Sequence, residues 1–427
     1  MTEFDIKTLL DENSAVDAYR ITEKRVESHE LFFVRGKLET VRSTDTQDTE
    51  VAVFSDHDGK RGDSSFSVFR GMSEVEAKAK IESAVSRAKL VFNEPYELPA
   101  GGDFSGEIEN DLSGLGLKEC AEKIADTILS AEQCDGCSIN ALEVFVYRDT
   151  VRVRNSEGVD KTQRITRADV ESIPTYTDAN GSYEIYHRMH FTDLDTDRLK
   201  REVSRKSHEV KDRANAKKAE PSENVTIVLR TDEISSMIDE LTYGLNYADV
   251  YTESNRWGLG DDVQTQGECD PLTVTMKAAV KGSDLSAFFD KDGTDLSDVT
   301  VIENGKVTAL WGSSRFGQYL KVGKPSGSLL CYSLKPGTLT DAEIKKTDHL
   351  ECASLSGLQI DPFADYLGGE IRLAYRVKDG VREPVTGITF STSLSGALNS
   401  MRLSERVVTD REYEGPEFML FKGAEIL

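Results

Sequence analysis

Two adjacent acids, Asp239 and Glu240, have side chains that could in principle take part in acid–base chemistry. Asp239 and Glu240 lie in a helix-like stretch that follows a strand-like segment, Val225 to Leu229. A carboxylate can take a proton from a metal-bound water, but hydrolysis then requires the metal or an acid partner close by. Because adjacent carboxylates on a helix are usually solvated, the two residues by themselves favour a structural role.

Two histidines and two cysteines have spacings that could hold a metal ion. His187 and His190 form an HxxH segment, but residues three apart in a strand point to opposite faces, so joint ligation would require a bend. Cys134 and Cys137 form a CxxC segment that follows a predicted helix and precedes a strand. A zinc knuckle needs a second ligand pair, and a redox CxxC lies at a helix start. We therefore predict a loop at the cysteines and no metal site.

A cluster of acids resembles the opening of a calcium loop. Asp193, Asp195 and Asp197 alternate as calcium ligands do, but Arg198 stands at the sixth position in place of glycine, and Ser204 stands at the twelfth. Without the glycine and the final glutamate such a loop cannot close around calcium. The cluster instead predicts the N-cap of a helix.

Two further patterns have structural explanations. Gly258-Leu259-Gly260 runs into Asp261-Asp262, whose charges would repel phosphate, so we predict a tight turn near the acidic helix, with peptide contact as the less favoured alternative. Tyr243, Tyr247 and Tyr251 recur every four residues, which predicts one helical stripe that forms a core or a subunit contact.

Composition excludes several classes of partner. The 427 residues include 76 acidic and 52 basic side chains, a net charge of −24 that repels nucleic acid. No apolar run long enough for a membrane helix is present, and the first ten residues do not resemble a signal peptide, so we expect a soluble cytoplasmic protein. Six cysteines are too few for a disulfide framework, and reduced thiols are expected.

The first 220 residues alternate strands and helices, which predicts an α+β domain. Strand periodicity between Val16 and Val68 is interrupted by turns at Arg35-Gly36 and Asp58-Gly59. Ser73 then begins an amphipathic helix, with Glu76 in the capping-box position. Residues 93–116 are rich in glycine and proline and predict a loop; helices are expected at 117–132 and 195–217, with strands at 138–191 between them.

This order of elements predicts an internal duplication, with repeats at 14–92 and 117–217. Residues 33–43 resemble residues 145–155, and each segment lies upstream of a strand and a charged helix. A polar joint at 217–224 marks the end of the domain.

Residues 221–427 predict a second domain rich in strands. After the strand at 225–229 and a helix at 232–247, glycine-punctuated strands follow, with Asn304-Gly305 as a hairpin turn. A curved sheet or a barrel with few helices fits this pattern best. The further strands are expected at 272–280, 299–310, 369–377 and 385–390.

Several segments, taken in order along the chain, resemble the TldD/PmbA family, whose members were named modulators of DNA gyrase. In the N-terminal half these are Arg35-Gly36-Lys37-Leu38-Glu39, Asn155-Ser156-Glu157-Gly158 and Asp212-Arg213-Ala214. In the C-terminal half they are Asp290-Lys291-Asp292-Gly293, Val301-Ile302-Glu303-Asn304-Gly305-Lys306-Val307, Pro325-Ser326-Gly327 and Gly380-Val381-Arg382-Glu383-Pro384-Val385.

The resemblance implies a zinc site that this chain lacks. Members similar to TldD are zinc peptidases whose C-terminal domain opens with a strand and a helix carrying His-Glu-x-x-x-His, and a cysteine near the C-terminus completes the site. Counted without gaps from Val228-Leu229, this motif falls on residues 239–244, where only Glu240 matches and Asp239 and Gly244 replace the histidines. No cysteine follows Cys352, and all histidines lie elsewhere: His29, His57, His187, His190, His208 and His349.

The missing ligands make the chain similar to the PmbA/TldE-like branch, which carries no metal and pairs with a TldD-like subunit. The resemblance thus implies a non-catalytic subunit without a cofactor, in a system that binds extended peptides as added strands while the partner cuts them. Two alternatives remain open. One is a homodimeric peptide-binding or scaffold protein without a catalytic partner. The other is a peptidase with a divergent site, for which His349 is the only histidine in the second domain.

Overall fold

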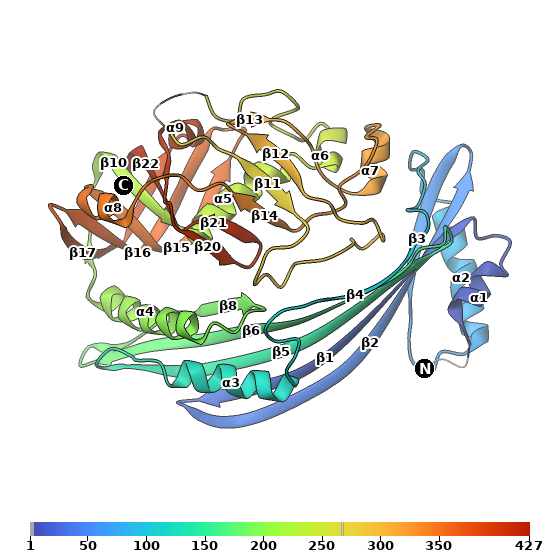
Figure 1. The fold of residues 1–427 in the computed structure, drawn as a ribbon, viewed down its shortest axis with the longest axis horizontal. Helices are drawn as coiled ribbons and strands as arrows, with labels where there is room; N and C mark the ends of the chain where they lie inside the picture. The colour runs from blue at the N-terminus through green and yellow to red at the C-terminus, as the bar shows by residue number, and fades with distance from the viewer. Residues whose placement is uncertain (1–3, 266, 268) are drawn as a thin grey trace.

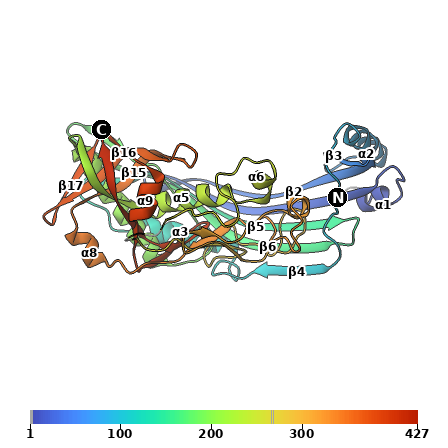
Figure 2. The ribbon, with the colours of Figure 1, turned by 90° about the horizontal axis from the view of Figure 1, so that it is seen from above.

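The chain folds into a long curved sheet and a strand-rich C-terminal domain that lies against one end of it. The computed structural model describes residues 4–265, 267 and 269–427. In Figure 1 the long strands sweep across the molecule, and the C-terminal domain lies above their concave side; Figure 2 shows the same strands from above, with α1 and α2 at the far end.

Eight strands form the N-terminal sheet, in the order β3-β2-β1-β5-β6-β4, with β7 and β8 paired to β6. The turns predicted at Arg35-Gly36 and Asp58-Gly59 are confirmed, because all four residues have the positive φ angles of tight hairpins. The strands are β1 (Ala18–Val34), β2 (Lys37–His57), β3 (Lys60–Val68), β4 (Asp103–Ile108), β5 (Cys137–Asn155), β6 (Asp160–Asp178), β7 (Gly181–Glu184) and β8 (His187–Phe191).

The loop predicted at 93–116 is wrong over residues 103–108. These residues form β4, which pairs in parallel with the Asp160–Ile165 part of β6. An edge strand of this kind depends on hydrogen bonds to a partner far away in the sequence, so glycine-rich local composition conceals it.

Helices cover the sheet near both of its ends. The capping box predicted at Ser73 and Glu76 is confirmed and begins α2 (Glu74–Ala88), which packs with α1 (Ile6–Asp11) on β1, β2 and β3. Toward the other end, α3 (Leu117–Leu129) and α4 (Thr196–Asn215) share a core with β1, β5 and β6.

The two halves of this sheet repeat one order of elements. Each half has a helix, two long strands, one or two shorter strands and a second helix. The order is α1-β1-β2-β3-α2 in the first half and α3-β5-β6-β7-β8-α4 in the second, and β1 and β5 are antiparallel neighbours at the centre. The residue correspondence inferred from sequence is wrong, however. Residues 33–43 contain the β1–β2 turn, whereas residues 145–155 lie entirely within β5. Similar alternation of apolar and charged residues does not fix where a strand turns.

The C-terminal domain contains a closed barrel, as the strand-rich pattern predicted. Its larger sheet has the order β15-β10-β22-β18-β16-β17-β9, and pairing of β15 with β16 closes the ring. Its strands are β9 (Lys217–Lys218), β10 (Ser222–Arg230), β15 (His349–Asp361), β16 (Tyr366–Lys378), β17 (Val381–Thr386), β18 (Ile388–Thr392), β19 (Arg402–Leu403) and β22 (Phe418–Ile426). Since β9 pairs with β17, this sheet begins slightly before residue 221.

A second C-terminal sheet packs beside the barrel, in the order β13-β12-β11-β14-β21-β20. The hairpin predicted at Asn304-Gly305 is confirmed and joins β12 to β13. The strands are β11 (Val274–Lys277), β12 (Val299–Glu303), β13 (Lys306–Val307), β14 (Cys331–Leu334), β20 (Val407–Asp410) and β21 (Tyr413–Pro416).

The C-terminal helices are short. The helix predicted at 232–247 is two helices, α5 (Thr231–Tyr243) and α6 (Tyr247–Tyr251), because Asn246 caps a new helix after Gly244. The single tyrosine stripe is therefore wrong: Tyr247 is 3% exposed, whereas Tyr243 is 60% and Tyr251 is 40% exposed. The remaining helices are α7 (Ser314–Tyr319), α8 (Asp341–Lys346) and α9 (Leu394–Ser400).

Charged side chains join the two domains. Lys161 on β6 donates to the Gly293 carbonyl at 2.9 Å and pairs with Asp295 at 2.7 Å. On α4, Glu209 accepts from Arg230 at 2.6 Å, at the junction of β10 and α5. These contacts set the position of α5 relative to the N-terminal sheet.

The cysteines differ from expectation at one pair. Cys134 and Cys137 form a disulfide at the start of β5, so reduced thiols are the wrong prediction for them. Four cysteines are free: Cys120, Cys269, Cys331 and Cys352. Among the described residues, no helix is both long and apolar enough to cross a membrane.

Candidate functional site

Helix α5 presents the acidic pair on its outer face. Ile234, Met237, Ile238 and Leu241 recur at helical spacing and are fully buried in the C-terminal core. The opposite face must therefore point outward. It carries Ser236, Asp239 and Glu240 into an open cleft.

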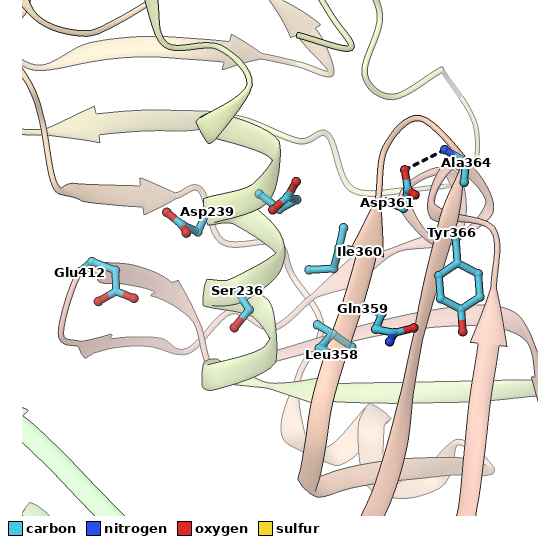
Figure 3. Close-up of a pocket in the computed structure, with 10 residues that line it drawn as sticks. Ser236, Asp239, Leu358, Gln359, Ile360, Asp361, Ala364, Tyr366 and Glu412 are labelled. Carbon is cyan, nitrogen blue, oxygen red and sulfur yellow. Dashed lines mark hydrogen bonds between the residues drawn. The ribbon is translucent and has the colours of Figure 1, made fainter. Parts of the chain in front are cut away.

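The cleft lies between α5 and the β15–β16 hairpin and has a volume of about 710 Å³. In Figure 3, Asp239 on α5 and Glu412 lie on one side, and the β15–β16 hairpin with Tyr366 lies on the other. Asp361 at the end of β15 accepts from the Phe363 and Ala364 amides at 2.9 and 2.8 Å, which fixes the tip of the hairpin. Leu358, Gln359, Ile360 and Ala364 complete the lining.

The charge of this cleft is entirely negative. Its lining includes the carboxylates of Asp239, Glu240, Asp361 and Glu412 and no lysine, arginine or histidine. Partial burial, with the nearby Glu412 carboxylate, raises the pKa of Asp239. Partial burial also raises the pKa of Glu240, with added repulsion from Asp239 and Asp361. A cationic group that entered the cleft would relieve this repulsion.

The β20–β21 hairpin brings more acids to α5. Glu412 lies in the turn between β20 and β21, and its carboxylate accepts a hydrogen bond from the Ser235 hydroxyl at 3.3 Å. Burial and a hydrogen bond to Asp232, in the first turn of α5, raise the pKa of Asp410 to about 8. Burial, reinforced by Asp232, also raises the pKa of Glu233 to about 7. Near neutral pH this end of the helix therefore retains protons that ordinary carboxyl groups have lost.

The acidic cleft does not fit the zinc that the family resemblance implies. Gly244 ends α5 and has no side chain, so it cannot supply the metal ligand that the second histidine of the motif would provide. Among the described residues, no three metal-ligating atoms within 4.8 Å of one another include Asp239 or Glu240. A lone carboxylate pair is a poor site for a borderline-soft ion, and no reaction step is assigned to zinc here.

The other sequence patterns lie outside the cleft. His187 and His190 face opposite sides of β8, as predicted: His187 lies in a cavity beside α4, and His190 donates to the Asp169 carboxylate on β6. The predicted N-cap at Asp195 is confirmed by its bond to the Arg198 amide at 2.8 Å. Gly258 and Gly260 form the predicted tight turn, but it packs on β13 and does not line the cleft.

Sequence reasoning missed Asp361, Tyr366 and Glu412. They lie more than 100 residues after α5, on hairpins whose placement depends on barrel closure and on the pairing of β14 with β21. The only local signal was the turn-forming Asp361-Pro362 sequence, which predicts a turn but not its neighbours.

A family comparison identifies the C-terminal domain. Residues 222–426 match the model of the PmbA/TldA metallopeptidase C-terminal domain. This domain belongs to the PmbA/TldD family. The match begins at β10 and contains α5, the cleft and both C-terminal sheets, so the cleft lies within the family's metallopeptidase-like domain. No curated protein sequence matches the chain.

Solved structures share the fold over nearly the whole chain. TldE from Thermococcus kodakarensis is 15% identical with a TM-score of 0.80, and covers 99% of this chain and 98% of its own. Candidate modulators of DNA gyrase from Thermotoga maritima (14% identity, TM-score 0.77, 99% and 98% covered) and Bacteroides thetaiotaomicron (12%, 0.79, 99% and 97%) are also similar. At these identities the likeness establishes the architecture of both domains.

Proposed function

We propose that this chain is a non-catalytic, PmbA/TldE-like subunit of a TldD-type peptidase system. The proposal rests on the count from Val228-Leu229, which places the family's zinc motif on α5, where only Glu240 matches it. Nothing else in the cleft replaces the missing imidazoles, because its lining has no histidine or cysteine. A domain that keeps the motif helix and its cleft but lacks the zinc ligands favours a role in binding and not in hydrolysis.

The cleft supports binding of an extended peptide. Beyond Glu351, β15 pairs with β16 on one side only, since its ladder with β10 is limited to Leu350 and Glu351. The outer edge of residues 355–361 therefore keeps free backbone donors and acceptors beside the cleft. An extended segment can pair with such an edge as an added strand.

The four cleft carboxylates favour a peptide with lysine or arginine side chains. The lining contains no basic side chain to pair with them, and partial burial, with added repulsion between the acids, raises the pKa of Asp239 and Glu240. A cationic side chain would gain Coulomb energy there, whereas an acidic peptide would add repulsion.

The first experiment tests the catalytic assignment. A TldD-like chain with an intact His-Glu-x-x-x-His motif, from the same organism, is mixed with this protein and assayed for peptide hydrolysis. We expect a stable complex whose activity is unchanged by Glu240→Gln in this chain but abolished when the partner's motif glutamate is replaced. Hydrolysis by this chain alone, lost in Glu240→Gln, would support the divergent peptidase instead.

A second experiment tests the cleft. Fluorescence anisotropy with an unstructured lysine-rich peptide should show binding that weakens at least tenfold in the Asp239→Asn/Glu412→Gln double variant. Glu39→Gln, on the exposed part of β2, is the matched control and should bind as the wild type does. Equal affinity for a glutamate-rich peptide of the same length would contradict the electrostatic argument. Failure to bind any TldD-like chain, with peptide binding retained, would favour the scaffold alternative.

A further inference from the structure

Three side chains with metal-ligating atoms meet between the domains, outside the lining of the acidic cleft. Asp169 on β6 and His190 on β8 are directly opposed in the sheet, and Asp284 approaches from the C-terminal loop between β11 and β12. His190 Nδ1 lies 2.8 Å from Asp169 Oδ1 and 4.0 Å from Asp284 Oδ2. The three ligand atoms all lie within 4.8 Å of one another. Figure 1 shows β8 on the side of the sheet that faces the C-terminal domain.

Asp284 is a buried carboxylate without a hydrogen bond. Its side chain is 7% exposed, and Oδ1 is fully buried with no hydrogen-bond partner in the described part of the chain. Its polar neighbours, Arg411 Nε at 3.9 Å and His190 Nδ1 at 4.0 Å, are too distant for hydrogen bonds. A carboxylate buried in this way costs several kilocalories per mole unless a further group satisfies it.

Arginines lie beside the outer oxygen of each carboxylate, and the inner oxygens face His190. Arg167 and Arg188 approach Asp169 Oδ2 at 3.2 and 3.6 Å, whereas Asp169 Oδ1 faces His190. Arg411 approaches Asp284 Oδ1, whereas Oδ2 faces His190. Such outer contacts orient ligating carboxylates in metal sites.

The local charge leaves room for a divalent cation. Each of the three arginines is shared with a second acid, so three positive charges face five negative ones and a balance of two negative charges remains with a neutral imidazole. The five acids are Asp149, Asp169, Glu171, Asp284 and Glu412.

The loop that supplies Asp284 is anchored on both sides. The Thr192 amide, just after β8, donates to the Gly282 carbonyl at 3.0 Å. Ser283, which is 1% exposed, contacts the Cys331 thiol at 3.3 Å and accepts from the Leu285 amide. Fixed backbone on either side of Asp284 lowers the entropy cost of bringing it to a shared ligand.

We propose that Asp169, His190 and Asp284 bind a divalent first-row metal ion that links the N-terminal sheet to the C-terminal domain. Two carboxylates and one imidazole suit Mn²⁺ or Zn²⁺ better than the all-oxygen cations Mg²⁺ and Ca²⁺. The three ligand atoms already lie within 4.8 Å of one another, and each would approach one ion to about 2.0–2.2 Å, with water completing its coordination. The site is structural, because it joins two domains and lies outside the peptide cleft.

The test uses the full-length protein after EDTA treatment and dialysis. Calorimetric titration with Mn²⁺ and with Zn²⁺ should show one ion per chain and a metal-dependent rise in Tm. His190→Gln and Asp284→Asn should each weaken binding at least tenfold. His29→Gln, a half-buried histidine within β1, and Glu240→Gln, in the cleft, should leave it unchanged; the second control separates this site from the acids of α5.

A spectroscopic readout keeps the test independent of the variants. In the wild-type protein, pulsed electron paramagnetic resonance of bound Mn²⁺ should show coupling to one imidazole nitrogen. Absence of a stoichiometric ion would overturn the proposal and leave His190 as a hydrogen-bond partner of Asp169 alone. Binding without nitrogen coupling, or binding unchanged in both ligand variants, would overturn it equally.

Discussion

Replacement of Asp410 by asparagine should remove a pH dependence of the folding stability that arises near the N-terminal end of α5. The Asp410 carboxyl is repelled by Asp232 and Glu412, and Arg198 is the cation that acts on it. Burial and the hydrogen bond to Asp232 raise its pKa to about 8, whereas in the unfolded chain it ionises near the ordinary value of 3.8. Between these two values the folded state holds one more proton than the unfolded state.

The sign and size of the effect follow from this proton. Stability must fall as pH rises from about 4 to 8, by about 1.4 kcal/mol per pH unit from this group alone. Asparagine keeps the shape of the protonated carboxyl and can still donate to Asp232, but it cannot ionise. The stability of Asp410→Asn relative to the wild type should therefore increase by about 2.7 kcal/mol between pH 5 and pH 7.

Urea unfolding at pH 5, 6 and 7, followed by tryptophan fluorescence, measures this difference. Both tryptophans, Trp257 and Trp311, lie in the C-terminal domain and report on the part of the chain that contains Asp410. Glu39→Gln is the control for loss of one exposed negative charge and should run parallel to the wild type at every pH. If Asp410→Asn also runs parallel to the wild type, the proton shared with Asp232 does not exist and the reasoning is refuted.

Three other predictions concern packing, a buried ion pair and assembly. Gly62→Ala would place a Cβ 1.8 Å from the Ala88 carbonyl oxygen and should lower stability by at least about 2 kcal/mol in urea unfolding; Gly114→Ala, with open space around it, should not. Glu209 is 3% exposed and bound to Arg230; although burial opposes it, the positive charges of Lys206, Arg230 and Arg205 lower the pKa of Glu209 to about 2. Glu209→Gln should therefore cost about 3–5 kcal/mol at pH 7, and the loss should shrink as pH falls below about 4.5 toward 2. Light scattering after size-exclusion chromatography should show the mass of a dimer, as expected for an obligate interface that buries roughly 2,000 Å² or more; a stable monomer would contradict this.

Local sequence determined the features that depend on neighbours along the chain. The hairpin at Arg35-Gly36 follows from residues that tolerate positive φ, and the start of α2 follows from the reciprocal bonds of Ser73 and Glu76. Absence of the zinc ligands around Glu240 was also visible, because a motif on one helix is a local pattern. In each case the interacting groups are only a few residues apart, so their spacing already contains the geometry.

Tertiary structure alone decided which distant groups meet. Glu412 reaches Asp239 only because β21 pairs with β14, and Asp284 reaches His190 only because a C-terminal loop packs on the end of β8. The edge strand β4 was hidden for the same reason, since its hydrogen bonds are all with β6. These contacts join residues dozens to more than a hundred positions apart, and their free energy comes from sheet closure and domain packing, which no local window of sequence contains.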